Sequence, residues 1–356
     1  MLMAEVSISF TDLLTEELNK LSLAKDSSKS LLAASARSTA AIDRARSALA
    51  QVPEMAGCGD DLVAFGSLAR HELTPSSDLD YLFIGMQEED SKRHQMVVID
   101  RLRETLVDGV VLSAPGSSGI FGSCIDASKL TEHVGLEDDT NHNLTRRILF
   151  LEESVSLFDP AVHEETIKTI LSMYLEARKS PSEKIPRFLL NDIIRYWRTI
   201  AVDYHAKQSR GNISGVPYSL RYLKLLISRK LCFISSIAPL YLLSYEGNPD
   251  ELEFLLRAFK EPAVLRLIRL LNYVDMDADG GREKVQRIVE TLDYFIERSG
   301  DQAWRKSVEI ECKEPDPKES ANFGDMRKRG KQLHQDISDV LTSKNMIHFT
   351  KEYMLS

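Results

Sequence analysis

Two short apolar segments, each joined to a polar motif, constrain the fold of this chain more than any other feature. Residues 61–66 (DLVAFG) predict a short buried strand that ends at a glycine turn, and residues 80–84 (DYLFI) predict a second strand. Gly66-Ser67 follows the first strand, and Asp78-Leu79-Asp80 leads into the second. Residues two apart on a strand project to the same face, so Asp78 and Asp80 can point at one site while Leu79 points into the core.

The segments around this pair predict a small α/β module. Helical periodicity over residues 10–50 precedes it, a charged helix follows Gly85, and a third strand is expected near residues 120–125. From Asn141 onward only helical periodicity recurs. We therefore expect an α+β fold with three parts, which are an N-terminal helical brace (1–50), an α/β module (51–140) and an all-helical C-terminal domain (141–356).

Length and composition indicate an ordinary globular protein. The chain has 356 residues, of which 43% are hydrophobic and 28% charged, so two packed domains are the natural expectation. A net charge of −9 argues against a protein that coats nucleic acid or an anionic membrane. The acidic N-terminal segment does not resemble a signal peptide, and the most apolar stretch, residues 237–243, is too short to span a bilayer. We expect a cytoplasmic protein.

The cysteines carry no recognisable pattern. They are Cys58, Cys124, Cys232 and Cys312, without a CxxC pair and without clustered histidines. Neither a zinc site nor a disulfide framework is therefore expected, and we predict reduced, mostly buried thiols.

The paired carboxylates suggest a chemistry for the motif. Nucleotidyl transfer needs two divalent ions about 3.5 to 4 Å apart, one to lower the pKa of the attacking hydroxyl and one to neutralise the departing pyrophosphate. Asp78 and Asp80 supply the hard oxygen ligands that Mg²⁺ prefers. Gly66 lets the backbone approach phosphate, and Ser67 adds a hydroxyl donor at the start of the following helix.

The segment FGSLARHELTPSSDLDYLFIG, residues 65–85, resembles the signature of the DNA polymerase β-like nucleotidyltransferases, in which a GS pair is followed after a short spacer by DxD. Its details, R-x-E-L-T-P-x-S-D-L-D, are most similar to the branch containing the uridylyltransferase that modifies the nitrogen-regulatory signal protein. The similarity is clear over residues 62–85 and looser to residue 159. It implies that Gly66 and Ser67 hold the triphosphate and that Asp78 and Asp80 bind two Mg²⁺ ions, with Mn²⁺ as an alternative.

The same superfamily usually has a third carboxylate, on a later strand beside the first two. Asp126, at the end of GIFGSCID, is the candidate here. The sequence Ala-Ser-Lys-Leu that follows is equally typical of a short helix with Asp126 as its N-cap. Asp138 and Asp139 are the alternatives for the third carboxylate, although both are also typical of solvated loop acids.

Arg70 lies inside the motif and has two interpretations. It can face phosphate from the turn after Gly66, or it can pair with Glu72 and hold the loop.

Two cationic stripes are further candidates for nucleotide binding. Arg195 and Arg198 share one face of a predicted helix, and Arg221 and Lys224 share a stripe with Tyr218 and Ser228 on the next. Arginines can grip phosphates in a bidentate manner, and Tyr218 or Tyr222 can stack on a base. The alternative is a pair of solvated faces with Asp192 and Asp203 as local partners.

These features predict an enzyme, an Mg-dependent nucleotidyltransferase that moves a nucleoside monophosphate from a nucleoside triphosphate to an acceptor hydroxyl. The resemblance favours a protein side chain as acceptor, while a nucleotide second messenger, a small molecule and an RNA end are alternatives. A non-enzymatic alternative is a nucleotide-binding regulatory or antitoxin-like protein that keeps the fold without turnover. No membrane partner is expected, and the acidic composition argues against bulk nucleic-acid binding.

Overall fold

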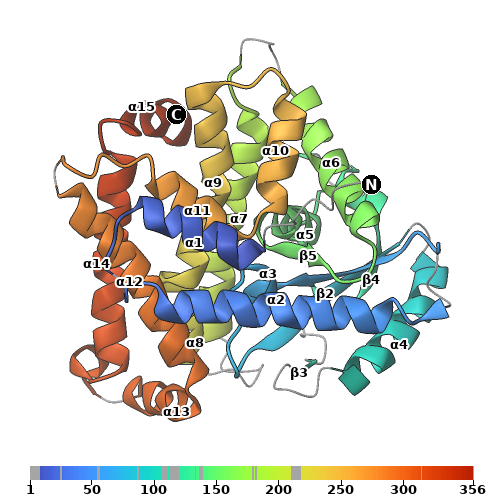
Figure 1. The fold of residues 1–356 in the computed structure, drawn as a ribbon, viewed down its shortest axis with the longest axis horizontal. Helices are drawn as coiled ribbons and strands as arrows, with labels where there is room; N and C mark the ends of the chain where they lie inside the picture. The colour runs from blue at the N-terminus through green and yellow to red at the C-terminus, as the bar shows by residue number, and fades with distance from the viewer. Residues whose placement is uncertain are drawn as a thin grey trace, which may run out of the picture.

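A computed structural model of the chain describes residues 9–24, 26–53, 57–85, 88–105, 111–112, 120–132, 134–135, 139–178, 180, 183–209, 218–278, 280–313 and 315–355. It has an α+β fold in which a small mixed sheet packs against many helices (Figure 1). The strands are β1 (Asp61–Phe65), β2 (Asp78–Gly85), β3 (Val111–Leu112), β4 (Cys124–Asp126) and β5 (Ser154–Ser156). The helices before β5 are α1 (Phe10–Lys20), α2 (Lys29–Leu49), α3 (Gly66–Ala69), α4 (Glu88–Thr105), the 3-10 helix η2 (Ala127–Leu130) and α5 (Asn141–Glu152).

The helices after β5 form most of the C-terminal part of the chain. They are α6 (Pro160–Glu176), α7 (Arg187–Ser209), α8 (Tyr218–Leu226), α9 (Ser228–Glu246), α10 (Glu251–Lys260), α11 (Ala263–Leu271), α12 (Gly281–Gly300), α13 (Gln302–Glu311), α14 (Phe323–Leu341) and α15 (Ile347–Phe349).

The strands are arranged around the pair that the sequence predicts. Their order is β3-β2-β1-β5, and β4 also pairs with β2. β1 is antiparallel to both β2 and β5, whereas β3 and β4 are parallel to β2. β1 and β2 lie where the sequence analysis expects them, with β2 beginning at Asp78. The third predicted strand is present as β4, shifted toward its C-terminal end.

β5 lies beyond the predicted limit of the α/β module. It pairs with β1 so that Val63 lies opposite Ser156 and Phe65 opposite Ser154. The prediction that everything after residue 140 is helical is therefore wrong. A strand of three residues is too short to show an apolar alternation, and it follows directly after a strongly periodic helix, so sequence periodicity could not reveal it.

The two faces of the sheet are both apolar. Leu62, Ala64 and Phe83 pack with residues of α2 and α4, whereas Val63, Phe65 and Leu82 belong to a larger core that continues into the C-terminal helices. The sheet and the C-terminal helices thus share one core. The strands that carry the GS and DxD motif are consequently packed against helices that come much later in the chain.

α2 runs across the molecule from the C-terminal helices to α4 (Figure 1). It contacts α4 on one side and α12 on the other. Arg37 Nε donates to the carbonyl oxygen of Leu73 at 3.1 Å, and Arg46 Nη2 donates to that of Ser156 at 2.9 Å. These bonds tie the helix to the loop before β2 and to β5.

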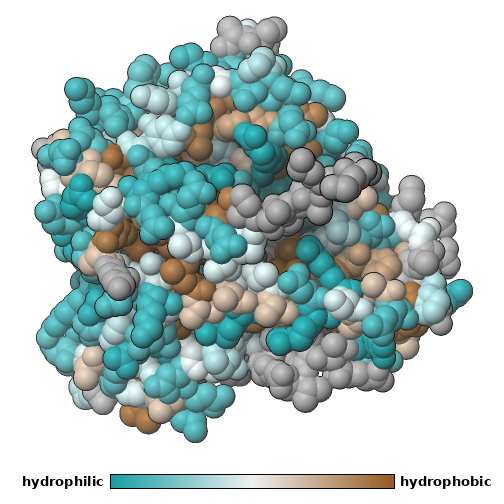
Figure 2. Space-filling model, viewed as in Figure 1, coloured by the Kyte–Doolittle hydropathy of each residue, from teal (hydrophilic) through white to brown (hydrophobic). Residues whose placement is uncertain are grey.

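Within the described residues, one segment is long and apolar enough to span a membrane, Tyr218–Glu246, which comprises α8 and α9. Its most apolar window is 72% buried inside the protein, as in the core helices of soluble proteins. The face of the molecule shown in Figure 2 is mostly hydrophilic, and its apolar side chains form separate patches.

Candidate functional site

Gly66 lies where β1 turns into the short helix α3. Its φ of +71° is in the left-handed region, which favours glycine. A Cβ at this position would lie 3.1 Å from Oδ2 of Asp80. Because Phe65 pairs with Asp80 in the sheet, the GS turn and the DxD strand lie side by side.

Asp78 and Asp80 project from the same face of β2. Asp78 is exposed, Asp80 is half-buried, and Leu79 between them is fully buried. Asp80 has the strand parity of Leu82 and Ile84, which belong to the core shared with the C-terminal helices. The two carboxylates therefore face the helical part of the molecule.

The two carboxylates line a pocket between the sheet and the helices. Counted together with space open to solvent, it has an empty volume of about 560 Å³. The sheet side contributes Gly66, Ser67, Arg70, Glu72, Thr74, Ser77, Asp78 and Asp80. The helical side contributes Lys224, Ser228, Arg229, Phe295, Ile296, Ser299 and Arg305.

Charges of both signs meet in this pocket. Burial raises the pKa of Asp80 to about 6, and the neighbouring Asp78 carboxylate adds to the increase, while Arg229 and Lys224 oppose it. Burial lowers the pKa of Lys224, although Asp78 counteracts the decrease. Asp80 thus lies in a partly desolvated position beside a like charge, which is a setting that a bound cation would stabilise.

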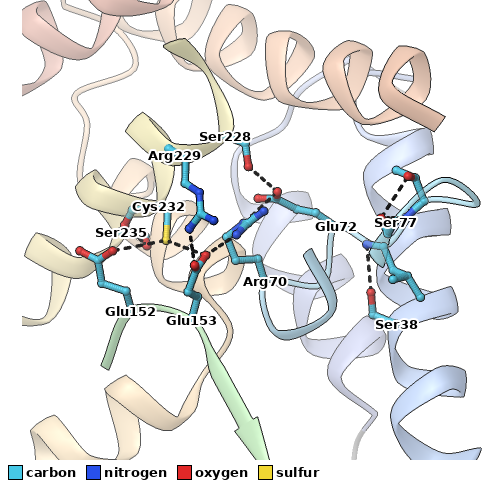
Figure 3. A network of polar contacts seen from close by, with 12 residues as sticks. Ser38, Arg70, Glu72, Ser77, Glu152, Glu153, Ser228, Arg229, Cys232 and Ser235 are labelled. Carbon is cyan, nitrogen blue, oxygen red and sulfur yellow. Dashed lines mark hydrogen bonds and ion pairs between the residues drawn. The ribbon is translucent and has the colours of Figure 1, made fainter. Parts of the chain in front are cut away.

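A buried ionic network underlies the pocket and joins the sheet to the helices (Figure 3). Arg70 donates to Glu72 at 3.0 Å and also pairs with Glu153, and Arg229 of α9 pairs with the other oxygen of Glu153. Ser228 Oγ donates to Glu72 at 2.5 Å. Although burial opposes it, the carboxylates of Glu72 and Glu153 raise the pKa of Arg70 well above its ordinary value. The predicted Arg70–Glu72 pair is confirmed, and the guanidinium is already committed to carboxylates.

The structure separates the predicted cationic residues. Lys224 and Ser228 line the pocket, and Arg221 does not. Arg195 and Arg198 are exposed on α7, where Arg195 pairs with Asp192 at 2.7 Å. The α7 stripe is therefore the solvated face that was the alternative interpretation, and the expectation that Arg195 and Arg198 contact phosphate is not supported by their position.

Arg229 lines the pocket but was missed by the sequence analysis, which placed Tyr218 to Ser228 on one regular helix. The backbone of Ile227 has φ −117° and ψ −84°, outside the helical region, so α8 ends at Leu226 and α9 begins at Ser228. This break changes the helical phase, and it brings Arg229 to the same side as Lys224 and Ser228. No apolar periodicity signals such a break, since Leu and Ile occupy both sides of it.

Arg305 is the second missed cation. It comes from α13, donates to the carbonyl oxygen of Ser76 at 3.0 Å, and has a buried Nε without a hydrogen-bond partner among the described residues. Ser76 Oγ in turn donates to the carbonyl oxygen of Gly300 at 3.1 Å. The loop before the DxD strand is thus bound to helices more than two hundred residues away in sequence, which no local pattern could indicate.

Asp126 is placed away from the two carboxylates. It pairs with Gly85, five residues further along β2 than Asp80, which is about 16 Å at a strand rise of ~3.3 Å per residue. Its neighbour Cys124 packs in the core under α4, so Asp126 also projects to the opposite face. Its carboxylate accepts from Ser128 N at 2.8 Å and caps η2. The prediction of Asp126 as a third carboxylate is wrong, and the N-cap alternative is confirmed.

The other acidic alternatives do not replace it. Asp139 forms a buried ion pair with Arg147 at 2.9 Å and does not line the pocket. Asp138 lies outside the described residues.

The residues that pair with the DxD end of β2 are apolar. Val111 pairs with Asp78 and Leu112 with Leu79. Gly122 N donates to the carbonyl oxygen of Tyr81, and the ring centroid of Phe121 lies 5.6 Å from that of Phe65, the residue that pairs with Asp80. Residues 110–125 contain no Asp or Glu. The strand on which the resemblance predicts a third carboxylate therefore lacks one beside Asp80.

The aromatic residues proposed for base stacking lie elsewhere. Tyr218 and Tyr222 pack against Tyr204, with ring centroids 5.2 and 5.9 Å away. Neither lines the pocket, whose apolar side is formed by Phe295 and Ile296 of α12.

A second group of polar residues could hold a metal ion. Cys58, Asp60 and His94 each offer one ligand atom, and these atoms lie within 4.8 Å of one another. The sequence analysis, which expects no zinc site from the spacing of the cysteines, did not identify this group. Cys58 and His94 are far apart in sequence, and only the packing of α4 on the start of β1 brings them together.

Neither a comparison with protein-family models nor a search of curated proteins found a match to this chain. The functional interpretation consequently depends on the motif and on the pocket around it.

Proposed function

We propose that this protein is a nucleotidyltransferase that binds a nucleoside triphosphate with Mg²⁺ in the pocket between β2 and α8, α9, α12 and α13. The observation that carries the proposal is the meeting of Gly66, Ser67, Asp78 and Asp80 with Lys224 and Arg305 around one pocket. A triphosphate carries the negative charge that the cations would bind, and a metal carries the positive charge that the carboxylates would bind.

Different residues of the pocket would contact different parts of the nucleotide. Lys224 has no hydrogen-bond partner among the described residues and is half-buried, so its ammonium group is free to bind phosphate oxygens. The orphan Nε of Arg305 is a second donor. Phe295 and Ile296 provide apolar surface for the base or sugar. Arg229 is bound to Glu153 and would contribute mainly positive potential.

The donor set of Asp78 and Asp80 fits Mg²⁺ rather than a softer ion, because carboxylates and hydroxyls offer oxygen ligands, and no Cys or His is among the described residues that line the pocket. When bound there, Mg²⁺ would supply charge neutralisation and a lowered pKa for the acceptor hydroxyl. The contact between Gly66 and Asp80 would hold the carboxylate next to the phosphate-binding turn. The acceptor hydroxyl would be that of a protein side chain, by the resemblance to the regulatory uridylyltransferase.

A nucleotide-binding protein without turnover is the second candidate, and the apolar edge beside Asp80 favours it. Val111 and Leu112 pair with the DxD end of β2 and Phe121 packs on Phe65 beside it, where the resemblance predicts a carboxylate that helps activate the acceptor. Such a protein would bind Mg-nucleotide and transfer nothing.

Calorimetry followed by a transfer assay tests both candidates. Each triphosphate is titrated into the protein with Mg²⁺ or with chelator, and the same protein is then incubated with α-labelled triphosphate and a cell lysate. Mg-dependent binding with label transfer supports the enzyme, and binding without transfer supports the silent protein. Absence of Mg-dependent binding to every triphosphate would contradict both.

A further inference from the structure

Cys58, Asp60 and His94 form a compact cluster where the chain enters β1. Their ligand atoms lie within 4.8 Å of one another. Cys58 and Asp60 precede β1, and His94 belongs to α4. We propose that this cluster binds one transition-metal ion of the Zn²⁺ type. The proposal is independent of the proposed nucleotide chemistry.

The carboxylate of Asp60 is held in place by its surroundings. It is 3% exposed, one oxygen accepts from Ser91 Oγ at 2.9 Å, and the other lies 2.6 Å from Nδ1 of His94. A Cβ on Gly85 would lie 2.1 Å from Oδ1 of Asp60 and 1.8 Å from Oγ of Ser91. The sheet therefore has a glycine at a position where a side chain would crowd this carboxylate, and Ser91 orients the carboxylate by a hydrogen bond, as polar neighbours commonly orient metal ligands.

The three donors suit Zn²⁺ and not Mg²⁺. Thiolate and imidazole are ligands for zinc and similar ions, whereas Mg²⁺ prefers oxygen alone. One thiolate and one carboxylate balance the two positive charges of the ion, and a neutral imidazole completes three protein ligands. On binding, the metal–sulfur bond replaces the S–H bond of Cys58, and that proton passes to solvent. The fourth position would hold water, since Cys58 is only partly buried.

The same residue types also occur in nucleophilic triads, but the arrangement here argues against one. A catalytic cysteine needs a nearby cation or a helix N-terminus to stabilise its thiolate, whereas the Cys58 thiol lies beside the Asp60 carboxylate. Asp60 lies next to both other side chains, which is the geometry of shared metal ligands.

The cluster is separate from the nucleotide pocket. Asp61 pairs with Ile84, whereas Phe65 pairs with Asp80, so the two groups lie at opposite ends of the β1–β2 pair. Four residues of strand correspond to about 13 Å. A bound ion would connect the start of β1 to α4, and it would stabilise that connection without touching the pocket.

The test begins with protein that has been freed of metal by a chelator. Titration with Zn²⁺ by calorimetry should give one ion per chain and a higher Tm. Titration with Co²⁺ should produce the sulfur-to-cobalt charge-transfer band of a thiolate ligand in the near ultraviolet. Binding of no ion, or of Co²⁺ without this band, would overturn the proposal.

Variants identify the ligands. Cys58→Ser and His94→Gln should each weaken Zn²⁺ binding by about tenfold or more, because even outer-shell losses cost 10- to 100-fold, and Cys58→Ser should remove the cobalt band. Cys312→Ser and His348→Gln are matched controls away from the cluster and should bind normally. Asp78→Asn with Asp80→Asn should also bind Zn²⁺ normally. Unchanged affinity in folded Cys58→Ser and His94→Gln proteins, or loss in the Asp78 and Asp80 variant, would show that the ion is bound elsewhere.

Discussion

The carboxylate of Asp80 lies so close to Gly66 that a side chain on Gly66 would have to displace it by a few tenths of an ångström. A Cβ at Gly66 would be 3.1 Å from Oδ2 of Asp80. Gly66 allows the turn after β1, and the Asp80 carboxylate is proposed to bind metal. Because the two residues are in such close proximity, a substitution of Gly66 should displace the Asp80 carboxylate.

Gly66→Ala should combine backbone strain with displacement of Asp80. The left-handed φ alone costs about 1 kcal/mol or more of stability for alanine, and Mg-nucleotide binding should be lost as well. Gly247→Ala is the matched control, because Gly247 has a φ of +67° with nothing within 4 Å of its Cβ position. It should lose similar stability in urea unfolding and keep nucleotide binding. Equal nucleotide affinity in the two variants would contradict the coupling.

Replacing both pocket carboxylates should abolish the response to metal. Asp78→Asn with Asp80→Asn preserves side-chain size but removes the charges that would bind Mg²⁺. The apo protein should gain slight stability, because two like charges on one strand face are removed. The Tm of wild type should rise with Mg-nucleotide, and that of the double variant should not. A variant that still transfers nucleotide at the wild-type rate would refute the metal assignment.

Lys224→Met should weaken Mg-nucleotide binding by about 1.5 to 3 kcal/mol, the value of a hydrogen bond to a charged group. Methionine keeps the apolar stem, so the Tm of the apo protein should not fall. Arg198→Met is the comparison, because Arg198 is exposed on α7 and should leave the Kd unchanged. If Arg198→Met weakens binding as much as Lys224→Met, the pocket is not the phosphate site.

Removing the charge of Glu153 should be strongly destabilising, because it leaves Arg70 and Arg229 in the interior with one fewer carboxylate. Loss of one partner from a buried ion pair typically costs about 3 to 5 kcal/mol. Glu153→Gln is measured by urea unfolding against Glu16→Gln, whose exposed pair with Lys20 should contribute less than about 1 kcal/mol. Similar losses of unfolding free energy in the two variants would mean that the buried network contributes no more to stability than an exposed ion pair.

Two buried histidines should make the protein less stable in acid. Burial lowers the pKa of His71 to about 3 and that of His163 to about 4, from 6.5 in the unfolded chain. The folded state therefore binds fewer protons than the unfolded state below pH 6.5. The free energy of unfolding is unaffected by these histidines above pH 6.5, and it decreases as the pH falls toward 4. At pH 5 the loss should be about 2 kcal/mol per histidine.

The measurement compares urea unfolding at pH 8 and pH 5. His71→Asn, which tolerates the positive φ of residue 71, and His163→Gln should each reduce the difference between the two pH values. Burial raises the pKa of Asp61 and Glu152 to about 8, which acts in the opposite direction, but these residues are present in every variant. His348→Gln is the exposed control. If neither His71→Asn nor His163→Gln changes the difference in stability between pH 8 and pH 5, the buried histidines are not the cause of the acid sensitivity.

The parts of the site that could be predicted are those encoded in adjacent residues. Gly66 and Asp80 are joined by a short turn and a two-strand pairing, which local patterns describe well. Lys224 was predicted because it lies on a regular helix. Arg229 was missed because the break at Ile227 changes the helical phase, and Arg305 was missed because α13 reaches the pocket only through tertiary packing.

The same distinction explains the fold. α1, α2, β1 and β2 follow from strong local periodicity, and they are present as expected. β5 was not predicted because three residues carry too little pattern, and its place in the sheet is determined by pairing with β1. Cys58 and His94 meet for a similar reason, since their contact depends on how α4 packs on the sheet.

The late position of β5 has a consequence for synthesis of the chain. While only the first 140 residues are available, one edge of β1 has no partner, and Val63 and Phe65 lack the strand that later covers their backbone. Unpaired apolar edges are templates for association with other chains. β5 can pair with this edge of β1 only after residue 156 has left the ribosome. The sheet is therefore completed by a strand that lies beyond the predicted module boundary at residue 140.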